Sequence, residues 1–430
     1  MAYTPVDVIE VRAWDARVGA LLPDPRTGSY VFEYDRAWRS SGREIAPTTM
    51  PLTSRRLFAF PNLPEATYHR LPSVIADSLP DAFGRSVLDA QLAREGVDPK
   101  QITPLDRLGY VASRGMGALE FRPVRGPRTT KPSAVHISDL VQAARAAVHG
   151  AFDGDDQTRA ALTQLIAVGT SAGGARAKAV IAWNRATGEI RSGQVPADPG
   201  FDQWLLKLDG TGDDGGFEAT SNWGRLEYAY YLMATAAGIE MMESTLLDEG
   251  GRAHFATRRF DRVEGEKVHV STLCAMAELD FRAKGVHDYS QLFQTIDRLE
   301  LGPGARLEAF RRMVFNTAAA NCDDHTKNFA FLLPRDGAWQ LAPAYDITHA
   351  HLPGNEWIER HLMSVNGKFE DVDRADLLAV ADRFEVPDGT AAIAAVLAAT
   401  AAWGDFGREA GVPADRIDAV ASDLADVRPT

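Results

Sequence analysis

The 430-residue sequence is poor in cysteine, in long apolar runs and in basic residues, and each shortage excludes a class of protein. Its two cysteines, Cys274 and Cys322, form no spaced pair, so we expect neither a disulfide framework nor a zinc site. We therefore expect the protein to lie in the reducing cytoplasm. No apolar run approaches the roughly 20 residues that cross a bilayer. The N-terminus has no signal-peptide pattern, so we expect no membrane association. The formal net charge of −13 argues against a surface devoted to nucleic acid.

Hydrophobic residues make up 45% of the chain, enough for an ordinary globular core. Alternating apolar and polar side chains predict a small sheet at 6–34, and Ser78-Leu-Pro-Asp predicts a helix start with Ser78 as its cap. Further strands are predicted at 178–183, 204–208 and 254–260, and helices at 222–238, 304–321, 374–384, 389–402 and 413–425. Together these patterns indicate an α+β protein.

The run Asn-Cys-Asp-Asp-His-Thr-Lys-Asn, residues 321–328, carries the strongest functional signal. Asp323 and Asn328 stand in the D-x-x-x-x-N frame with which protein kinases hold a proton-accepting Asp and a magnesium-binding Asn on one loop. Asp324 competes for the role of base, and only the five-residue offset to Asn328 favours Asp323. His325 and Lys327 are placed either to contact phosphate or to brace the loop.

A second acidic position, Asp346, follows shortly in Ala344-Tyr-Asp-Ile. The segments 329–333 and 338–341, joined by Pro334-Arg-Asp-Gly, predict a β-hairpin that returns Asp346 beside Asn328. Asn328 and Asp346 would then offer oxygen ligands to Mg²⁺, and phosphate oxygens would complete an octahedron. This arrangement predicts phosphoryl transfer.

Two features of the preceding segment fit a nucleotide. Gly173 and Gly174 lie in a loop where glycine lets backbone N–H groups approach phosphate, although the Walker-type frame is absent. Lys207 lies on an apolar strand, where its ammonium needs a partner. Phosphate groups, Glu227 on the following helix, or water at a sheet edge are the alternatives.

Seven motifs carry a resemblance to a known family. They are Asp77–Arg85, Gly115–Phe121, Ser171–Lys178, Leu205–Leu208, Arg259–Arg262, Asp323–Asn328 and Pro343–Ile347. Through them the chain resembles, over nearly its whole length, the HipA-type serine/threonine kinases, toxins of bacterial two-component toxin–antitoxin systems. The last two motifs, in this order and separation, are the specific ones.

The resemblance implies roles for individual residues. Asp323 matches the family's proton acceptor, and Asn328 and Asp346 match its magnesium ligands. The implied ATP contacts are Gly173, Gly174, Ala175, Arg176, Ala177, Lys178, Lys207, Arg258, Arg259, Phe260, His325, Thr326, Lys327, Asn328, Tyr345 and Asp346, of which Arg258, Arg259 and Phe260 form the adenine-side hinge. Ser171 matches a serine that the family autophosphorylates, and a phosphate there would repel the nucleotide.

Four positions depart from the family pattern. Arg176 and Ala177 stand where the family's loop often has Gln-Glu, and Arg258 stands at a hinge position that often holds Glu. Ile347 follows the metal Asp in place of the Phe-Gly of eukaryotic kinases.

The implied fold is a two-lobed, protein-kinase-like α+β fold with an additional small N-terminal α/β domain. The implied division is a HipA-type N-terminal domain at 1–125, a linker at 126–136, a nucleotide-covering lobe at 137–262 and a mainly helical catalytic lobe at 263–430. The implied activity uses ATP and Mg²⁺ to phosphorylate a protein hydroxyl, by family precedent on a translation factor or an aminoacyl-tRNA synthetase. A cognate HipB-like, DNA-binding antitoxin is the implied partner, and DNA would be reached only through it.

Three other functions remain open from the residues alone. A pseudokinase would bind nucleotide or antitoxin without phosphorylating anything, against which the intact set of Asp323, Asn328 and Asp346 argues. A metal-dependent phosphohydrolase would need more His and carboxylate ligands from separate segments. A small-molecule kinase would use the same loop on a different acceptor.

Overall fold

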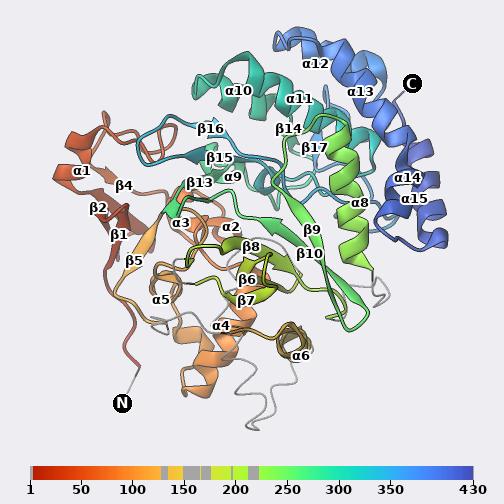
Figure 1. Ribbon diagram of the computed structural model, residues 1–430. Coiled ribbons are helices and arrows are strands. Elements are labelled where there is room, and N and C mark those ends of the chain that lie inside the picture. The colour runs from red at the N-terminus through yellow and green to blue at the C-terminus, as the bar shows by residue number, and fades with distance from the viewer. Residues whose placement is uncertain are drawn as a thin grey trace. The chain divides into compact units, whose positions relative to one another are not determined.

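The computed structural model describes residues 3–126, 134–148, 165, 176–194, 197–211 and 222–429 (Figure 1). The chain divides into two compact units. Unit 1 comprises Met1–Ser221 and Leu247–Val270, and unit 2 comprises Asn222–Leu246 and Ser271–Thr430. Unit 1 holds two five-stranded sheets, whereas long helices dominate unit 2, so the predicted α+β class is confirmed. The four-part division predicted from the sequence stays a prediction.

Unit 1 begins with an antiparallel sheet in the order β4-β3-β2-β1-β5. Alternate residues of its strands are buried, as the period of a one-sided strand requires, and this confirms the sheet predicted at 6–34. The elements of this region are β1 (Ile9–Ala13), β2 (Ala16–Pro23), β3 (Tyr30–Tyr34), α1 (Arg36–Ser41), β4 (Leu57–Phe58), α2 (Glu65–Tyr68), α3 (Ser73–Ala76), α4 (Ala82–Arg94), a 3-10 turn (Pro99–Gln101), α5 (Pro104–Val111) and β5 (Glu120–Arg122).

Helix α4 starts later than the sequence pattern predicts. Its cap is Asp81, whose Oδ1 accepts a hydrogen bond from the backbone N–H of Gly84 at 2.7 Å, so the assignment of Ser78 as cap is wrong. Asp and Ser cap about equally well, but a carboxylate also complements the positive end of the helix dipole.

The second sheet of unit 1 has the order β7-β6-β8-β10-β9. Helices α4 and α6 (Ile137–Val148) pack on one of its faces, where Trp204 and Leu206 are fully buried (Figure 1). The strands are β6 (Lys178–Asn184), β7 (Glu189–Ser192), β8 (Asp202–Lys207), β9 (Ser244–Glu249) and β10 (Arg252–Arg258), followed by the hairpin β11 (Arg262–Val263) and β12 (Glu266–Lys267). The strands predicted at 178–183, 204–208 and 254–260 are confirmed, each with its end moved by one or two residues.

Unit 2 is built around one large apolar core that its long helices share. The helices are α8 (Trp223–Ala236), α9 (Leu273–Met276), α10 (Ser290–Arg298), α11 (Gly302–Ala318), α12 (Arg374–Arg383), α13 (Gly389–Ala401), α14 (Trp403–Glu409) and α15 (Ala414–Asp426). The five helices predicted in this part are confirmed as α8, α11, α12, α13 and α15, whereas α9, α10 and α14 were not predicted. Helix α14 follows α13 after a bend of 54°.

Short strands complete unit 2 and carry its polar loops. They are β14 (His287–Asp288), which pairs in parallel with β17 (Met363–Ser364), and the antiparallel pair β15 (Ala330–Leu333) and β16 (Gln340–Leu341). Strand β13 (His269–Thr272), in which the chain passes from unit 1 to unit 2, lies next to β15 in the same sheet. Among the described residues no single helix is long and apolar enough to span a membrane, although α13 and α14 pass that test as a bent pair.

Candidate functional site

The acidic run of unit 2 forms a short loop between α11 and the β15–β16 hairpin. Residues Thr326–Asn328 make a single 3-10 turn, and Phe331 pairs with Leu341 in the hairpin that follows, as the sequence predicts. Beyond the hairpin, the hydroxyl of Tyr345 donates a hydrogen bond to the carbonyl oxygen of Lys327 at 2.6 Å. The segment that carries Asp346 therefore returns to the acidic loop.

The start of this loop is fixed by a backbone bridge. The N–H of Ala350 donates to the carbonyl of Ala320 at 3.0 Å, and the N–H of Cys322 donates to the carbonyl of Ala350 at 2.9 Å. Ala320 itself has a φ of 50° and Asp346 a φ of 56°, in the left-handed region. An alanine there costs roughly 1–2 kcal/mol, and such strain persists only where the surroundings impose it, most often at functional sites.

The structure separates the two candidate bases by exposure. The side chain of Asp323 is 45% exposed, whereas that of Asp324 is fully buried. Asp324 Oδ1 accepts a hydrogen bond from the backbone N–H of Leu362 at 2.7 Å, and Oδ2 accepts one from the hydroxyl of Tyr289 at 2.8 Å. His361 Nδ1 lies 3.0 Å from the same Oδ2. A carboxylate enclosed in this way cannot reach a substrate, so Asp324 braces the loop and Asp323 is the carboxylate open to solvent.

The brace extends into helix α11. Asn316 Nδ2 donates to the hydroxyl oxygen of Tyr289 at 2.9 Å, and Asn321 Nδ2 donates to Asn316 Oδ1 at 2.9 Å. Burial raises the pKa of Tyr289 far above its usual value, and the nearby charge of Asp324 adds to this, so the hydroxyl stays a donor. The chain of hydrogen bonds thus holds the loop at Asn321 and again at Asp324.

Asn328 closes the loop. Its Nδ2 donates to the backbone carbonyl of Asp323 at 2.6 Å, which is why a D-x-x-x-x-N spacing bends into a compact turn. With the donor nitrogen committed, the remaining polar atom of the amide is Oδ1, an oxygen of the type that Mg²⁺ prefers. The donor set of Asn328 and Asp346 therefore fits a magnesium ion that takes its other ligands from phosphate and water. No group of three or more His, Cys, Asp or Glu that could hold a metal by itself occurs in the described part of the chain.

The three residues between Asp324 and Asn328 each contact a neighbouring segment. His325 packs edge-on against Phe281 with 5.3 Å between ring centroids, and its Nε2 lies 3.8 Å from Asp323 Oδ1. Thr326 is fully buried and donates its hydroxyl to the carbonyl of Leu279 at 2.9 Å, so its side chain braces the loop. The ammonium of Lys327 lies 4.9 Å from the centre of the Phe281 ring.

Cys322 precedes the proposed base but is not a nucleophile. Its side chain is buried, and burial raises the pKa of its thiol, with the charges of Asp324 and Asp323 adding to the effect. The thiol therefore stays protonated and contributes to packing.

In unit 1, the two lysines assigned to ATP are directly paired across neighbouring strands. Lys178 of β6 lies opposite Lys207 of β8, and Lys207 lies opposite Phe255 of β10. Directly opposed like charges destabilise a sheet unless an anion balances them. Asp81 balances one of them, because its Oδ2 lies 3.3 Å from the ammonium of Lys178, and both side chains are buried. The predicted pairing of Lys207 with Glu227 joins the two units and stays a prediction.

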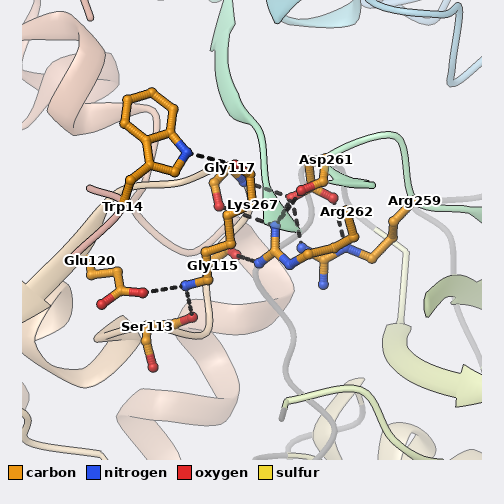
Figure 2. Close-up of polar contacts among 9 residues, drawn as sticks. All are labelled: Trp14, Ser113, Gly115, Gly117, Glu120, Arg259, Asp261, Arg262 and Lys267. Atoms are coloured by element: carbon orange, nitrogen blue, oxygen red, sulfur yellow. Dashed lines mark hydrogen bonds and ion pairs between the residues drawn. The ribbon is translucent and has the colours of Figure 1, made fainter. Parts of the chain in front are cut away.

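The hinge residues lie at the end of β10 and directly after it. Arg258 is exposed and donates to Asp202 at 2.8 Å, whereas Arg259 is buried. Both ends of the Arg259 guanidinium donate to the carboxylate of Asp261, at 2.8 and 2.7 Å (Figure 2). Its backbone N–H donates to the carbonyl of Gln203. The guanidinium of Arg259 is therefore engaged with the protein, and any contact of this segment with adenine falls to its remaining backbone groups and to Phe260.

Several predicted residues cannot be placed. Ser171, Gly173, Gly174 and Ala175 lie outside the described residues, and Arg176 and Ala177 lead directly into β6.

The loop, the returning hairpin and the paired lysines define a protein with a kinase-like α+β fold. A model of the HipA-like C-terminal domain matches residues 170–420, and a model of the HipA N-terminal domain matches residues 9–122. The chain belongs to the HipA family.

The sequence identity to individual proteins of known structure or name is low. A solved HipA of Shewanella oneidensis MR-1, in complex with HipB and its operator DNA, has a TM-score of 0.65 and 14% sequence identity over 97% of this chain and 95% of that one, which shows a common fold. A Sinorhizobium fredii protein named as a kinase, Y4dM, is 28% identical over 169 residues, so the matched part spans 39% of that relative. The Helicobacter pylori proinflammatory kinase CtkA matches 53% of this chain with a TM-score of 0.33 and 12% identity.

Two functional roles were missed by the sequence analysis. Asp324 was weighed only as a rival base, and Asp81 only as a residue near a helix start. Their burial depends on segments far away in the chain, His361 in one case and Lys178 in the other. The local sequence pattern around Asp324 and Asp81 does not indicate that either side chain is buried.

Proposed function

We propose that this protein is an ATP- and Mg²⁺-dependent serine/threonine protein kinase of the HipA type. The observation that carries the proposal is the closed turn of Asp323 and Asn328, with its buried brace at Asp324. The turn leaves one carboxylate exposed and one amide oxygen available, which are the two groups that phosphoryl transfer asks of such a loop.

In the proposed reaction the hydroxyl oxygen of a serine or threonine attacks the γ-phosphorus of ATP. The bond from that phosphorus to the oxygen of ADP breaks, and Asp323 accepts the hydroxyl proton. Magnesium, held by Asn328 and Asp346, would neutralise the charge of the phosphates. Lys207 would contact the same phosphates, because it matches a lysine with which the family contacts ATP. The acceptor hydroxyl would include Ser171.

A HipB-like, DNA-binding antitoxin is the proposed partner. Its support is the family membership and the solved HipA complex, which contains HipB and operator DNA. A net charge of −13 makes a direct role of this chain on DNA unfavourable, so the antitoxin would supply the DNA contacts. The target protein would be a translation factor or an aminoacyl-tRNA synthetase.

The test is incubation of phosphatase-treated protein with Mg²⁺ and γ-labelled ATP, followed by mapping of the labelled peptide. We expect label on Ser171 in the wild type and none in Asp323→Ala or Asp346→Ala. Asp418→Ala, which removes an exposed carboxylate from helix α15 of unit 2, is the matched control and should label like the wild type.

Other outcomes would replace the proposal. Binding of ATP without any labelled protein, also when candidate substrates are added, would indicate a pseudokinase. Release of free phosphate without a labelled protein would indicate a phosphohydrolase. Label that is retained in both Asp323→Ala and Asp346→Ala would show that the base and the metal ligand are elsewhere.

A further inference from the structure

Two motifs of the family resemblance contain residues that have no part in the chemistry described so far. They are Gly115–Phe121, in the HipA N-terminal domain match, and Arg259–Arg262, in the C-terminal match. Both lie in unit 1, where they contact each other through one buried charged cluster (Figure 2).

Asp261 is at the centre of this cluster. It is fully buried, and its carboxylate accepts hydrogen bonds from Arg259, from Arg262 Nη1 at 2.7 Å and from the backbone N–H of Gly117 at 2.7 Å. Burial opposes ionisation, but the two guanidinium groups and the N–H of Gly117 outweigh it and hold the pKa of Asp261 below its usual range. The carboxylate is therefore charged, and it holds Arg259, Arg262 and the loop of Gly117 together.

Arg262 also joins the segment after β10 to the Gly115–Gly117 loop. Besides Asp261, its guanidinium donates to the carbonyl oxygens of Gly117 and Gly115, both at 3.1 Å. Gly117 has a φ of +77°, and a Cβ there would lie 3.0 Å from the backbone nitrogen of Val270. Only glycine fits this position without strain, so the loop of the N-terminal domain is shaped to receive the segment that follows β10.

The hairpin β11–β12 is held at its second strand as well. The ammonium of Lys267 donates to the carboxylate of Glu120 at 2.7 Å and to the carbonyl of Ser113 at 2.8 Å. The indole N–H of Trp14 donates to the carbonyl of Lys267 at 2.7 Å (Figure 2). Both strands that follow the hinge are thus tied to the N-terminal sheet and to the loop before β5.

We infer that the N-terminal domain supports the nucleotide site. Its contacts with Asp261 and Arg262 fix the conformation of the hinge residues Arg259 and Phe260. Asp261 and Arg262 are positioning residues, because neither lies among the residues assigned to the nucleotide. This inference rests on the proposed function, since it takes Arg258–Phe260 to be the adenine side of the site. A hinge that is less well fixed would bind ATP more weakly and leave the transfer step, which uses Asp323, nearly unchanged.

The test uses Arg262→Met and Arg262→Lys. Methionine removes every hydrogen bond of the guanidinium, whereas lysine keeps a charge beside Asp261 but cannot donate to both glycine carbonyls in the same geometry. Arg56→Met is the matched control, because Arg56 pairs with Glu33 on the exposed surface of the same domain, away from the hinge. The single-turnover rate of label incorporation is measured against ATP concentration, and ATP binding is measured separately by equilibrium dialysis.

We expect Arg262→Met to raise the half-saturating ATP concentration and the dissociation constant by about tenfold, with a smaller rise for Arg262→Lys and none for Arg56→Met. The maximal rate should change less than about threefold. If Arg262→Met does not fold, Arg262→Lys decides. Folded variants that bind ATP like the wild type, or that lose maximal rate with unchanged ATP dependence, would overturn the inference. A wild type that binds ATP but transfers no phosphate would instead refute the proposed function, and the dialysis would still test the hinge.

Discussion

Asn328 donates a hydrogen bond from its side-chain nitrogen to the backbone carbonyl of Asp323, 2.6 Å away. This bond joins the two residues to which the proposed reaction assigns different tasks, proton acceptance and metal binding. It also explains the spacing between them, because a side chain five positions further along can reach the carbonyl only if the intervening residues form a tight turn.

Asn328→Asp should separate the two tasks of this side chain. The carboxylate keeps an oxygen for Mg²⁺ but removes the N–H donor and sets a negative charge against the carbonyl of Asp323. We expect the rate constant of phosphoryl transfer to fall on the order of 10- to 100-fold, as for loss of a hydrogen bond that holds a catalytic group. Asn355→Asp is the control, because the oxygen that accepts from the N–H of Trp357 is retained. Equal rates in the two variants would show that the Asn328–Asp323 bond has no catalytic importance.

Asp324→Asn should affect stability more than any exposed carboxylate does. The new amide group cannot accept from both the N–H of Leu362 and the hydroxyl of Tyr289 as the carboxylate does. We expect the free energy of unfolding to fall by about 2–3 kcal/mol. The exposed Asp371→Asn, at a φ of 52° that asparagine tolerates, should stay within about 0.5 kcal/mol in the same denaturant titration. If Asp324→Asn is as stable as that control, the buried brace has been given the wrong role.

Lys207→Met should weaken ATP binding. Lys207 of β8 pairs in register with Lys178 of β6, and both match residues with which the family contacts ATP. Loss of a charged hydrogen bond to phosphate should raise the dissociation constant for ATP about 10- to 100-fold. Lys100→Met, which removes an exposed lysine from the 3-10 turn of the same unit, should bind ATP normally. Unchanged binding by Lys207→Met would remove this lysine from the nucleotide site.

The pair of Asp81 and Lys178 should show strong coupling in a double-mutant cycle. Asp81→Asn keeps an oxygen to cap α4 but leaves the buried ammonium of Lys178 without its carboxylate. We expect a loss of about 3 kcal/mol in the free energy of unfolding for this variant and partial recovery when Lys178→Met is added. A coupling free energy below about 0.5 kcal/mol would show that the two charges act independently.

His269 should make unit 1 less stable in acid. Burial lowers the pKa of His269 to about 4, although its Nε2 lies 3.1 Å from the carbonyl of Ile45. The unfolded chain binds the proton near pH 6.5, where the folded protein does not. The free energy of unfolding should therefore fall as the pH drops from about 6.5 to about 4, by up to about 1.4 kcal/mol per pH unit for this one group.

His269→Gln provides the comparison, because glutamine can donate to the same carbonyl and does not titrate. Chemical unfolding of both proteins across that pH range should give a shallower slope for the variant. Parallel curves would show that His269 does not contribute to the acid sensitivity.

Elements that depend on neighbouring residues could be predicted from the sequence. The alternation of β1 to β3, the hairpin that follows Asn328 and the D-x-x-x-x-N turn all depend on residues a few positions apart, and all were predicted. Helix α14 was missed because its own sequence, Trp403–Glu409, contains Gly404 and Gly407, and glycine disfavours a helix. Its packing against α8 and α15 stabilises it.

The burial of particular charged groups follows from the packing of distant segments and could not be predicted from the sequence. Asp323 and Asp324 are neighbours of the same type, and nothing local distinguishes them; the structure does so because Tyr289 and Leu362 enclose one and leave the other open. Asp261 is likewise an ordinary acidic residue by its local sequence, and only the contact with the loop of Gly117 shows its role. Burial and desolvation depend on segments that are distant in sequence, whereas periodicity and spacing record only what lies within a turn or a strand.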